Sequence, residues 1–143
     1  MRILHILGTS KWTGPASYVV DILDYLKENN IPNLIAIRSK PAGILKDILT
    51  DKKIKFKELN LYKKFNPLYF YEDITNLKKI IKNFKPDIVH THYSTENILS
   101  IFVKSKNFKL IRSIHNTKAS KKKAFFKIFI KEKRFFSYSL FRI

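Results

Sequence analysis

The chain has 143 residues, of which 45% are apolar, so it is long enough for one domain with a hydrophobic core and too short for two ordinary ones. It has no cysteine, which excludes disulfides, thiolate metal sites and cysteine nucleophiles. The formal charge of +18 implies an anionic partner: a nucleic acid, a phospholipid surface or a phosphorylated substrate.

The first half of the chain alternates short apolar runs with helical patterns. Proline after Gly14 suits a first helical turn, and apolar residues then recur at helical spacing until Asn29-Asn30. Strands are therefore predicted at 2–7, 33–38 and 54–59, the last as an edge strand, with helices between Gly14 and Asn29 and from 43 to 52.

The second half continues the alternation. After a loop at 60–67, one apolar stripe predicts a helix that Lys85-Pro86 ends, because proline disfavours helix in the preceding residue. The stripe consists of Phe70, Ile74, Leu77, Ile81 and Phe84. Strands are predicted at 87–91 and 109–114, with a helix at 96–104 between them and a basic helical segment at the end.

This order of elements predicts an α/β fold, a Rossmann-like parallel sheet with helices on both faces, in one domain over 1–143. With the usual strand order 3-2-1-4-5, ligands bind beyond the carboxyl ends of the first and fourth strands. Three polar clusters follow strand ends in or beside that crevice, at 8–14, 91–97 and 115–118. The topology therefore predicts a site there.

The loop at 8–14, G-T-S-K-W-T-G, matches neither G-x-G-x-x-G nor a phosphate-cradling G-x-x-x-x-G-K-[ST] motif. It precedes a helix amino terminus, which can accept a phosphate or a sugar hydroxyl. A tight turn that needs glycine is an equal alternative.

Four histidines remain for imidazole chemistry. His90 and His92 alternate along a strand, so their side chains point the same way, but a metal pair is disfavoured because only Glu96 lies nearby as a carboxylate. We expect His90 to pack in the sheet, His92 to meet a ligand, and His5 to be structural. His115 ends the fifth strand, where it can donate to a phosphate or hydroxyl, or else bond to the backbone.

Four segments resemble the opening of family 4 ("group 1") glycosyltransferases. They are R-I-L-H-I-L at 2–7, G-P-A-S-Y-V-V-D-I-L at 14–23, I-I-K-N-F-K-P-D-I-V-H-T-H at 80–92 and K-L-I-R-S-I-H-N at 109–116. Their order and spacing fit over nearly all of residues 1–120, and K-P-D-I-V-H-T-H is the most specific. The first loop departs slightly, because the family often has Gly-Gly where this chain has Thr13-Gly14.

The resemblance implies a GT-B fold, in which two Rossmann-like domains face each other across a cleft and no catalytic metal or other cofactor is needed. The amino-terminal domain binds the acceptor and the other binds a nucleotide sugar, and a hexose is transferred with retention of configuration. It implies His115 as the catalytic contact to the transferred sugar, and Gly14 with Thr13 as the loop near donor phosphates and acceptor. The implied acceptor-binding residues are His92, Ser94, Glu96 and Asn97.

The family holds its donor through a Glu-x7-Glu motif in the second domain, and this chain has none. Residues 141–143 lie where the family's next strand is expected to begin. We therefore expect an incomplete amino-terminal domain that is inactive without a donor-binding domain or chain. The implied process is cell-envelope or surface polysaccharide synthesis on a saccharide or lipid-linked acceptor.

The segment 118–143 holds seven Lys and two Arg against one Glu and is expected to be a basic amphipathic helix. It can lie on an anionic membrane, or pack its Phe face on the sheet. The candidate membrane contacts are Lys121, Lys122, Lys123, Lys127, Lys131 and Arg134. The longest stretches without Lys, Arg, Asp or Glu have nine residues, so no transmembrane helix is expected, and the protein is expected to be cytoplasmic, soluble or peripheral at the inner face of the membrane.

Two competing functions remain open. One is a non-catalytic basic module that binds an anionic membrane surface or nucleic acid, although recognisable nucleic-acid-binding modules are missing. The other is a nucleotide-binding oxidoreductase domain. It is disfavoured because the chain lacks G-x-G-x-x-G and its second strand ends at Ile37-Arg38 without an acidic residue.

Overall fold

The structure, a computed structural model, describes residues 1–62 and 64–113. Five parallel strands form one sheet in the order β3-β2-β1-β4-β5, as the alternation of elements predicted. The strands are β1 (Ile3–Leu7), β2 (Asn33–Arg38), β3 (Phe56–Leu59), β4 (Ile88–Thr91) and β5 (Lys109–Arg112). The helices are α1 (Gly14–Glu28), α2 (Leu45–Asp51), α3 (Pro67–Phe84) and α4 (Ser94–Phe102).

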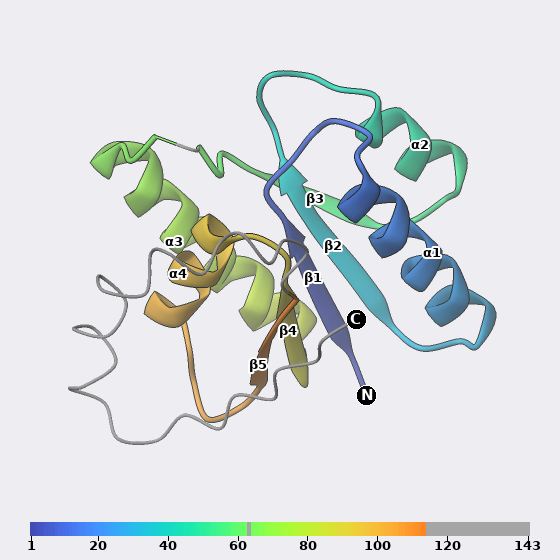
Figure 1. The fold of residues 1–143 in the computed structure, drawn as a ribbon. Coiled ribbons are helices and arrows are strands. Elements are labelled where there is room, and N and C mark those ends of the chain that lie inside the picture. Colours follow the sequence, from blue (N-terminus) through green and yellow to red (C-terminus); the bar gives the residue numbers. More distant parts are fainter. Residues whose placement is uncertain (63, 114–143) are drawn as a thin grey trace.

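The helices cover the sheet on both faces, with α1 and α2 on one side and α3 and α4 on the other (Figure 1). Side chains alternate between two cores. Leu4, Ile6 and Val89 pack toward α3 and α4, whereas Leu7 and Ile37 pack toward α1 and α2. This alternation decides which polar side chains of β1 and β4 share a face.

Local sequence sets the ends of the two longest helices. Thr13 caps α1, and Asn66 caps α3 by accepting hydrogen bonds from the amides of Leu68 and Tyr69, so each proline that follows occupies the first turn. Lys85 ends α3 in the left-handed region, at φ 51°, immediately before Pro86. Helix α4 begins at Ser94, two residues before its predicted start.

None of the helices in the described part of the chain is long and apolar enough to cross a membrane. The predicted basic segment 118–143, with its candidate membrane contacts, lies outside the described residues, as does His115. Their predicted roles stay predictions.

Candidate functional site

The carboxyl edge of the sheet brings together two of the three predicted polar clusters. The loop after β1 and the turn from β4 into α4 meet through Glu96, whose Oε1 accepts hydrogen bonds from the backbone amides of Gly8 at 3.0 Å and Tyr93 at 2.8 Å. We call Gly8, Tyr93 and Glu96 the junction. It lies at the point where strand order reverses, which is where doubly wound sheets bind ligands.

The carboxylate of Glu96 is fully buried. Its Oε2 has no hydrogen-bond partner within the described structure, and a Cβ added to Gly8 would lie 2.8 Å from it. Burial raises the pKa of Glu96, and hydrogen bonds from backbone amides, including those of Gly8 and Tyr93, oppose that shift. A side chain at position 8 would therefore force the Glu96 carboxylate to move.

The loop between β1 and α1 has a different character. Thr13 Oγ1 accepts a hydrogen bond from the amide of Ala16 at 3.4 Å, so Thr13 acts as the helix cap. A Cβ added to Gly14 would meet nothing within 4 Å, so no described group crowds this helix amino terminus. The structure thus leaves space at the position predicted to approach donor phosphates and acceptor.

The four predicted acceptor-binding residues are not equally accessible. His92, Glu96 and Asn97 are buried, and Thr91 Oγ1 donates to Asn97 Oδ1 at 3.3 Å. Ser94 Oγ accepts a hydrogen bond from Arg112 at 2.9 Å. The buried side chains shape the turn from β4 to α4, and their direct contact with an acceptor stays a prediction.

Three histidines lie together beside the junction. His5 and His90 are register partners on β1 and β4, and the His90 and His92 rings are 4.3 Å apart between centroids, as their alternation predicted. Burial lowers the pKa of His5 to about 3, and the charge of His90 adds to this effect. His5 is therefore neutral at pH 7.

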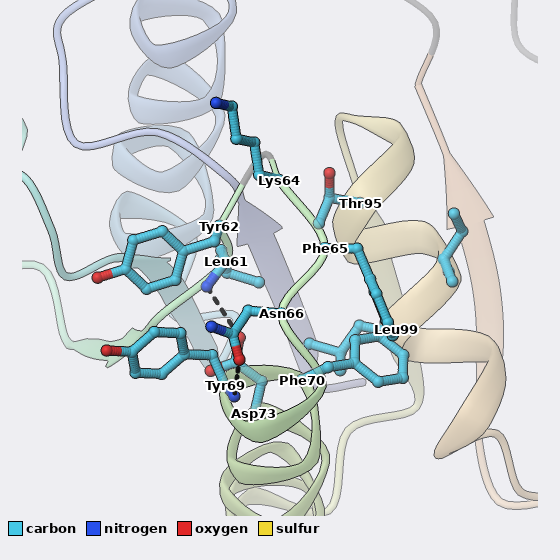
Figure 2. A pocket seen from close by; sticks show the side chains of 11 residues that line it. Leu61, Tyr62, Lys64, Phe65, Asn66, Tyr69, Phe70, Asp73, Thr95 and Leu99 are labelled. Atoms are coloured by element: carbon cyan, nitrogen blue, oxygen red, sulfur yellow. Dashed lines mark hydrogen bonds between the residues drawn. The ribbon is translucent and has the colours of Figure 1, made fainter.

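A pocket that the sequence did not predict opens beside α4. This cavity of about 150 Å³ lies between the loop after β3, the start of α3 and the first turns of α4 (Figure 2). We call it the aromatic pocket. It is lined by Leu61, Tyr62, Lys64, Phe65, Asn66, Tyr69, Phe70, Asp73, Thr95, Ile98 and Leu99.

The base of the aromatic pocket is held by hydrogen bonds, whereas its walls carry exposed aromatic side chains. Buried Asp73 accepts hydrogen bonds from the amides of Asn60 at 2.7 Å and Leu61 at 2.8 Å, and burial raises its pKa. Tyr62 stacks on Tyr69 at 4.7 Å between ring centroids, and Figure 2 shows this pair across from Phe65. Phe65, at the rim of the cavity, is 75% exposed.

One clue to this pocket was present in the sequence. Aromatic residues are dense between positions 62 and 71, but helical periodicity predicts Phe70 in the core and a loop at 60–67. Only the packing of that loop against α4 shows that the aromatics form a concave surface.

The glycosyl transferase 4-like family model matches residues 9–141. The chain therefore belongs to the glycosyl transferase 4-like family. No curated protein matches the chain.

Solved structures share the fold at low sequence identity. A glycosyltransferase from Rickettsia africae ESF-5 has a TM-score of 0.63 and 22% identity, over 80% of this chain and 29% of that one. The lipopolysaccharide outer core galactosyltransferase WaaB has a TM-score of 0.61 and 17% identity, over 78% of this chain and 32% of that one. Anabaena HepE in complex with UDP has a TM-score of 0.58 and 15% identity, over 81% of this chain and 30% of that one. The fold is thus that of the amino-terminal part of GT-B enzymes, and the chain spans about a third of their length.

Proposed function

We propose that this chain forms the acceptor-side domain of a retaining glycosyltransferase that moves a hexose from a nucleotide sugar to a saccharide or lipid-linked acceptor. Membership of the glycosyl transferase 4-like family supports the reaction class. The Anabaena relative was crystallised with UDP, which supports a nucleotide-linked donor. Donor and acceptor specificity are part of the proposal.

One observation carries the assignment of the site. The junction holds the β1–α1 loop and the start of α4 together at the strand-order reversal, and the aromatic pocket opens beside the first turns of that same helix. This arrangement supports placing the anionic leaving group and the acceptor on the same edge of the sheet.

We assign the donor side of the reaction to the β1–α1 loop and His115. The amino terminus of α1 at Thr13 and Gly14 offers backbone amides to a diphosphate, whose charge grows as the sugar leaves. His115 would donate to the transferred sugar or its phosphate. His92, Ser94, Glu96 and Asn97 would shape the acceptor side.

We assign the acceptor to the aromatic pocket, and its exposed apolar rim favours a lipid-linked saccharide over a free one. Leu68 and Tyr71, next to the pocket at the start of α3, are 80% and 73% exposed, and Phe65 lies at its mouth. Aromatic side chains suit a boundary between an apolar and a polar phase. Such an acceptor fits envelope or surface polysaccharide synthesis at the inner face of the membrane.

The proposed reaction also uses a donor-binding domain, and the match of this chain to about a third of each GT-B structure supports that part of the proposal. We expect the 143-residue chain to release no nucleotide from a panel of UDP-, GDP- and dTDP-sugars with short-chain polyprenyl-phosphate saccharides as acceptors. Measurable transfer or hydrolysis by this chain that His115→Ala abolishes would contradict the need for a second domain.

Acceptor binding can be tested without turnover. Titration with a short-chain polyprenyl-phosphate saccharide, followed by methyl NMR, should shift resonances of Leu61, Ile98 and Leu99, whereas a free oligosaccharide should shift them less. Phe65→Ala should weaken binding. Tyr25→Ala is the matched control, because Tyr25 is 62% exposed on α1 and does not line the pocket. Equal effects of the two variants would contradict the assignment.

A further inference from the structure

Three of the four histidines of the chain lie close together on one face of the sheet. His5 on β1 and His90 on β4 are register partners, so their side chains leave the same face, and His92 follows two residues later on that face. The rings of His5 lie 5.1 Å from His90 and 5.7 Å from His92, measured between centroids. One ring nitrogen from each residue lies within 4.8 Å of the other two.

Hydrogen bonding within the trio leaves part of its polar capacity unused. His5 Nδ1 lies 3.4 Å from His92 Nε2, a long contact for a hydrogen bond. His5 Nε2 is buried without a hydrogen-bond partner in the described structure. A group that accepted the lone pairs of His5 Nδ1 and His92 Nε2 would replace this long contact with two stronger bonds.

We propose that His5, His90 and His92 form a binding site for a single borderline divalent transition-metal ion, with Zn²⁺ the best candidate. Neutral imidazole is a preferred zinc ligand, at Zn–N distances of about 2.0–2.1 Å. Two such nitrogens in tetrahedral geometry are roughly 3.4 Å apart, and the His5 and His92 nitrogens already lie at 3.4 Å. The His90 nitrogen lies within 4.8 Å of both, so its ring would move closer when the ion binds.

The surroundings of His90 also suit a ligand. Ser113 Oγ lies 2.8 Å from His90 Nε2, and contacts of this kind to the far nitrogen orient metal-binding imidazoles. The trio provides three ligands, so a water molecule or another group would complete the coordination.

The ion would have a structural role. Through His5 and His90 it would tie β1 to β4 three residues before Gly8 and Tyr93, where Gly8 and Glu96 already join the segments that follow these two strands. It would hold the two loops of the carboxyl edge in place and take no part in glycosyl transfer. The inference is therefore independent of the proposed function.

The test is titration of the chelator-stripped 143-residue chain with zinc chloride, followed by calorimetry and thermal unfolding. We expect saturable binding of one ion per chain and a higher Tm. Because each histidine supplies one ligand, His5→Gln, His90→Gln and His92→Gln should each weaken binding by more than about tenfold. Ser113→Ala should weaken it less.

Thr91→Val is the matched control. Thr91 lies between His90 and His92, and its hydroxyl lies 3.3 Å from both Asn97 Oδ1 on α4 and the backbone oxygen of Ile111 on β5. The variant should lose stability and keep its zinc affinity. Circular dichroism would confirm that each variant is folded.

A second measurement needs no variant. In ¹⁵N NMR spectra of the wild-type imidazoles, zinc should shift the signals of His5, His90 and His92. Absence of saturable binding would overturn the proposal. So would unchanged affinity in all three glutamine variants, or a loss of affinity confined to His115→Gln.

Discussion

The junction and the aromatic pocket lie on the same edge of the sheet and are built in opposite ways. In the junction a buried carboxylate joins two backbone segments, and an added methyl group at Gly8 would collide with it. In the aromatic pocket a buried carboxylate fixes the base, while large apolar side chains such as Phe65 remain exposed at the rim.

The junction and the aromatic pocket therefore have different tasks: the junction holds loops in position, and we propose that the pocket rim contacts a partner. A buried polar group that is hydrogen-bonded to the backbone sets where neighbouring loops lie. An exposed apolar side chain adds little to folding and gains most of its burial when a partner arrives. Substitutions at the junction should therefore lower stability, and substitutions at the pocket rim should lower binding alone.

The largest effect is expected for Glu96→Ala. It leaves the buried amides of Gly8 and Tyr93 without their acceptor and should lower the free energy of unfolding by roughly 3 kcal/mol, as measured by urea denaturation. Glu96→Gln keeps an acceptor and should cost much less.

Asp47→Ala is the matched control for Glu96→Ala, because Asp47 also lies in the first turn of a helix but is exposed. It should cost less than about 1 kcal/mol. Equal losses at the two positions would show that the junction does not join the loops as described.

The second effect is a pH dependence near the junction. The pKa of His5 is about 3 in the folded chain and 6.5 as the ordinary value, so between these values the unfolded chain binds more protons. Stability therefore falls as the pH drops below 6.5. The loss from His5 should be about 2 kcal/mol between pH 7.5 and pH 5.

Urea denaturation across this range, with a chelator present, checks the contribution of His5. The stability difference between wild type and His5→Gln should shrink by that amount toward pH 5. A difference that stays constant with pH would mean that folding does not change the pKa of His5.

The elements of this fold were predictable because periodicity reports which side chains are buried. The stripe from Phe70 to Phe84 and the proline after Lys85 located α3, and alternating strands and helices gave the parallel sheet. The start of α4 was missed by two residues, because the bond from the amide of Tyr93 to Glu96 extends this helix toward β4.

The sequence predicted where the site lies, but not which side chains form it. Topology indicated the carboxyl edge between the first and fourth strands, and the junction lies there. The histidine trio depends on the register between His5 and His90, which one strand's sequence does not contain. The aromatic pocket depends on a loop that folds back onto α4, and loop conformation has no periodic signal.

A smaller stability loss is expected for Gly8→Ala, about 1.5 kcal/mol, because the new methyl group forces Glu96 to move. Gly14→Ala is the control, since its added methyl group would meet nothing within 4 Å, and it should change stability by less than about 0.5 kcal/mol. In a Glu96→Ala background the cost of Gly8→Ala should largely disappear. Additive losses would contradict the close contact between the two residues.

The smallest stability effect should come from Phe65→Ala at the rim of the aromatic pocket. Because 75% of Phe65 is exposed, removing its ring should change the free energy of unfolding by less than about 0.5 kcal/mol. Phe108→Ala is the contrasting variant, since Phe108 is 5% exposed and should cost about 3 kcal/mol or more. A large loss for Phe65→Ala would mean that its ring supports the fold. If Phe65→Ala keeps its stability and binds the acceptor more weakly, the pocket rim contacts the acceptor and the junction positions the loops.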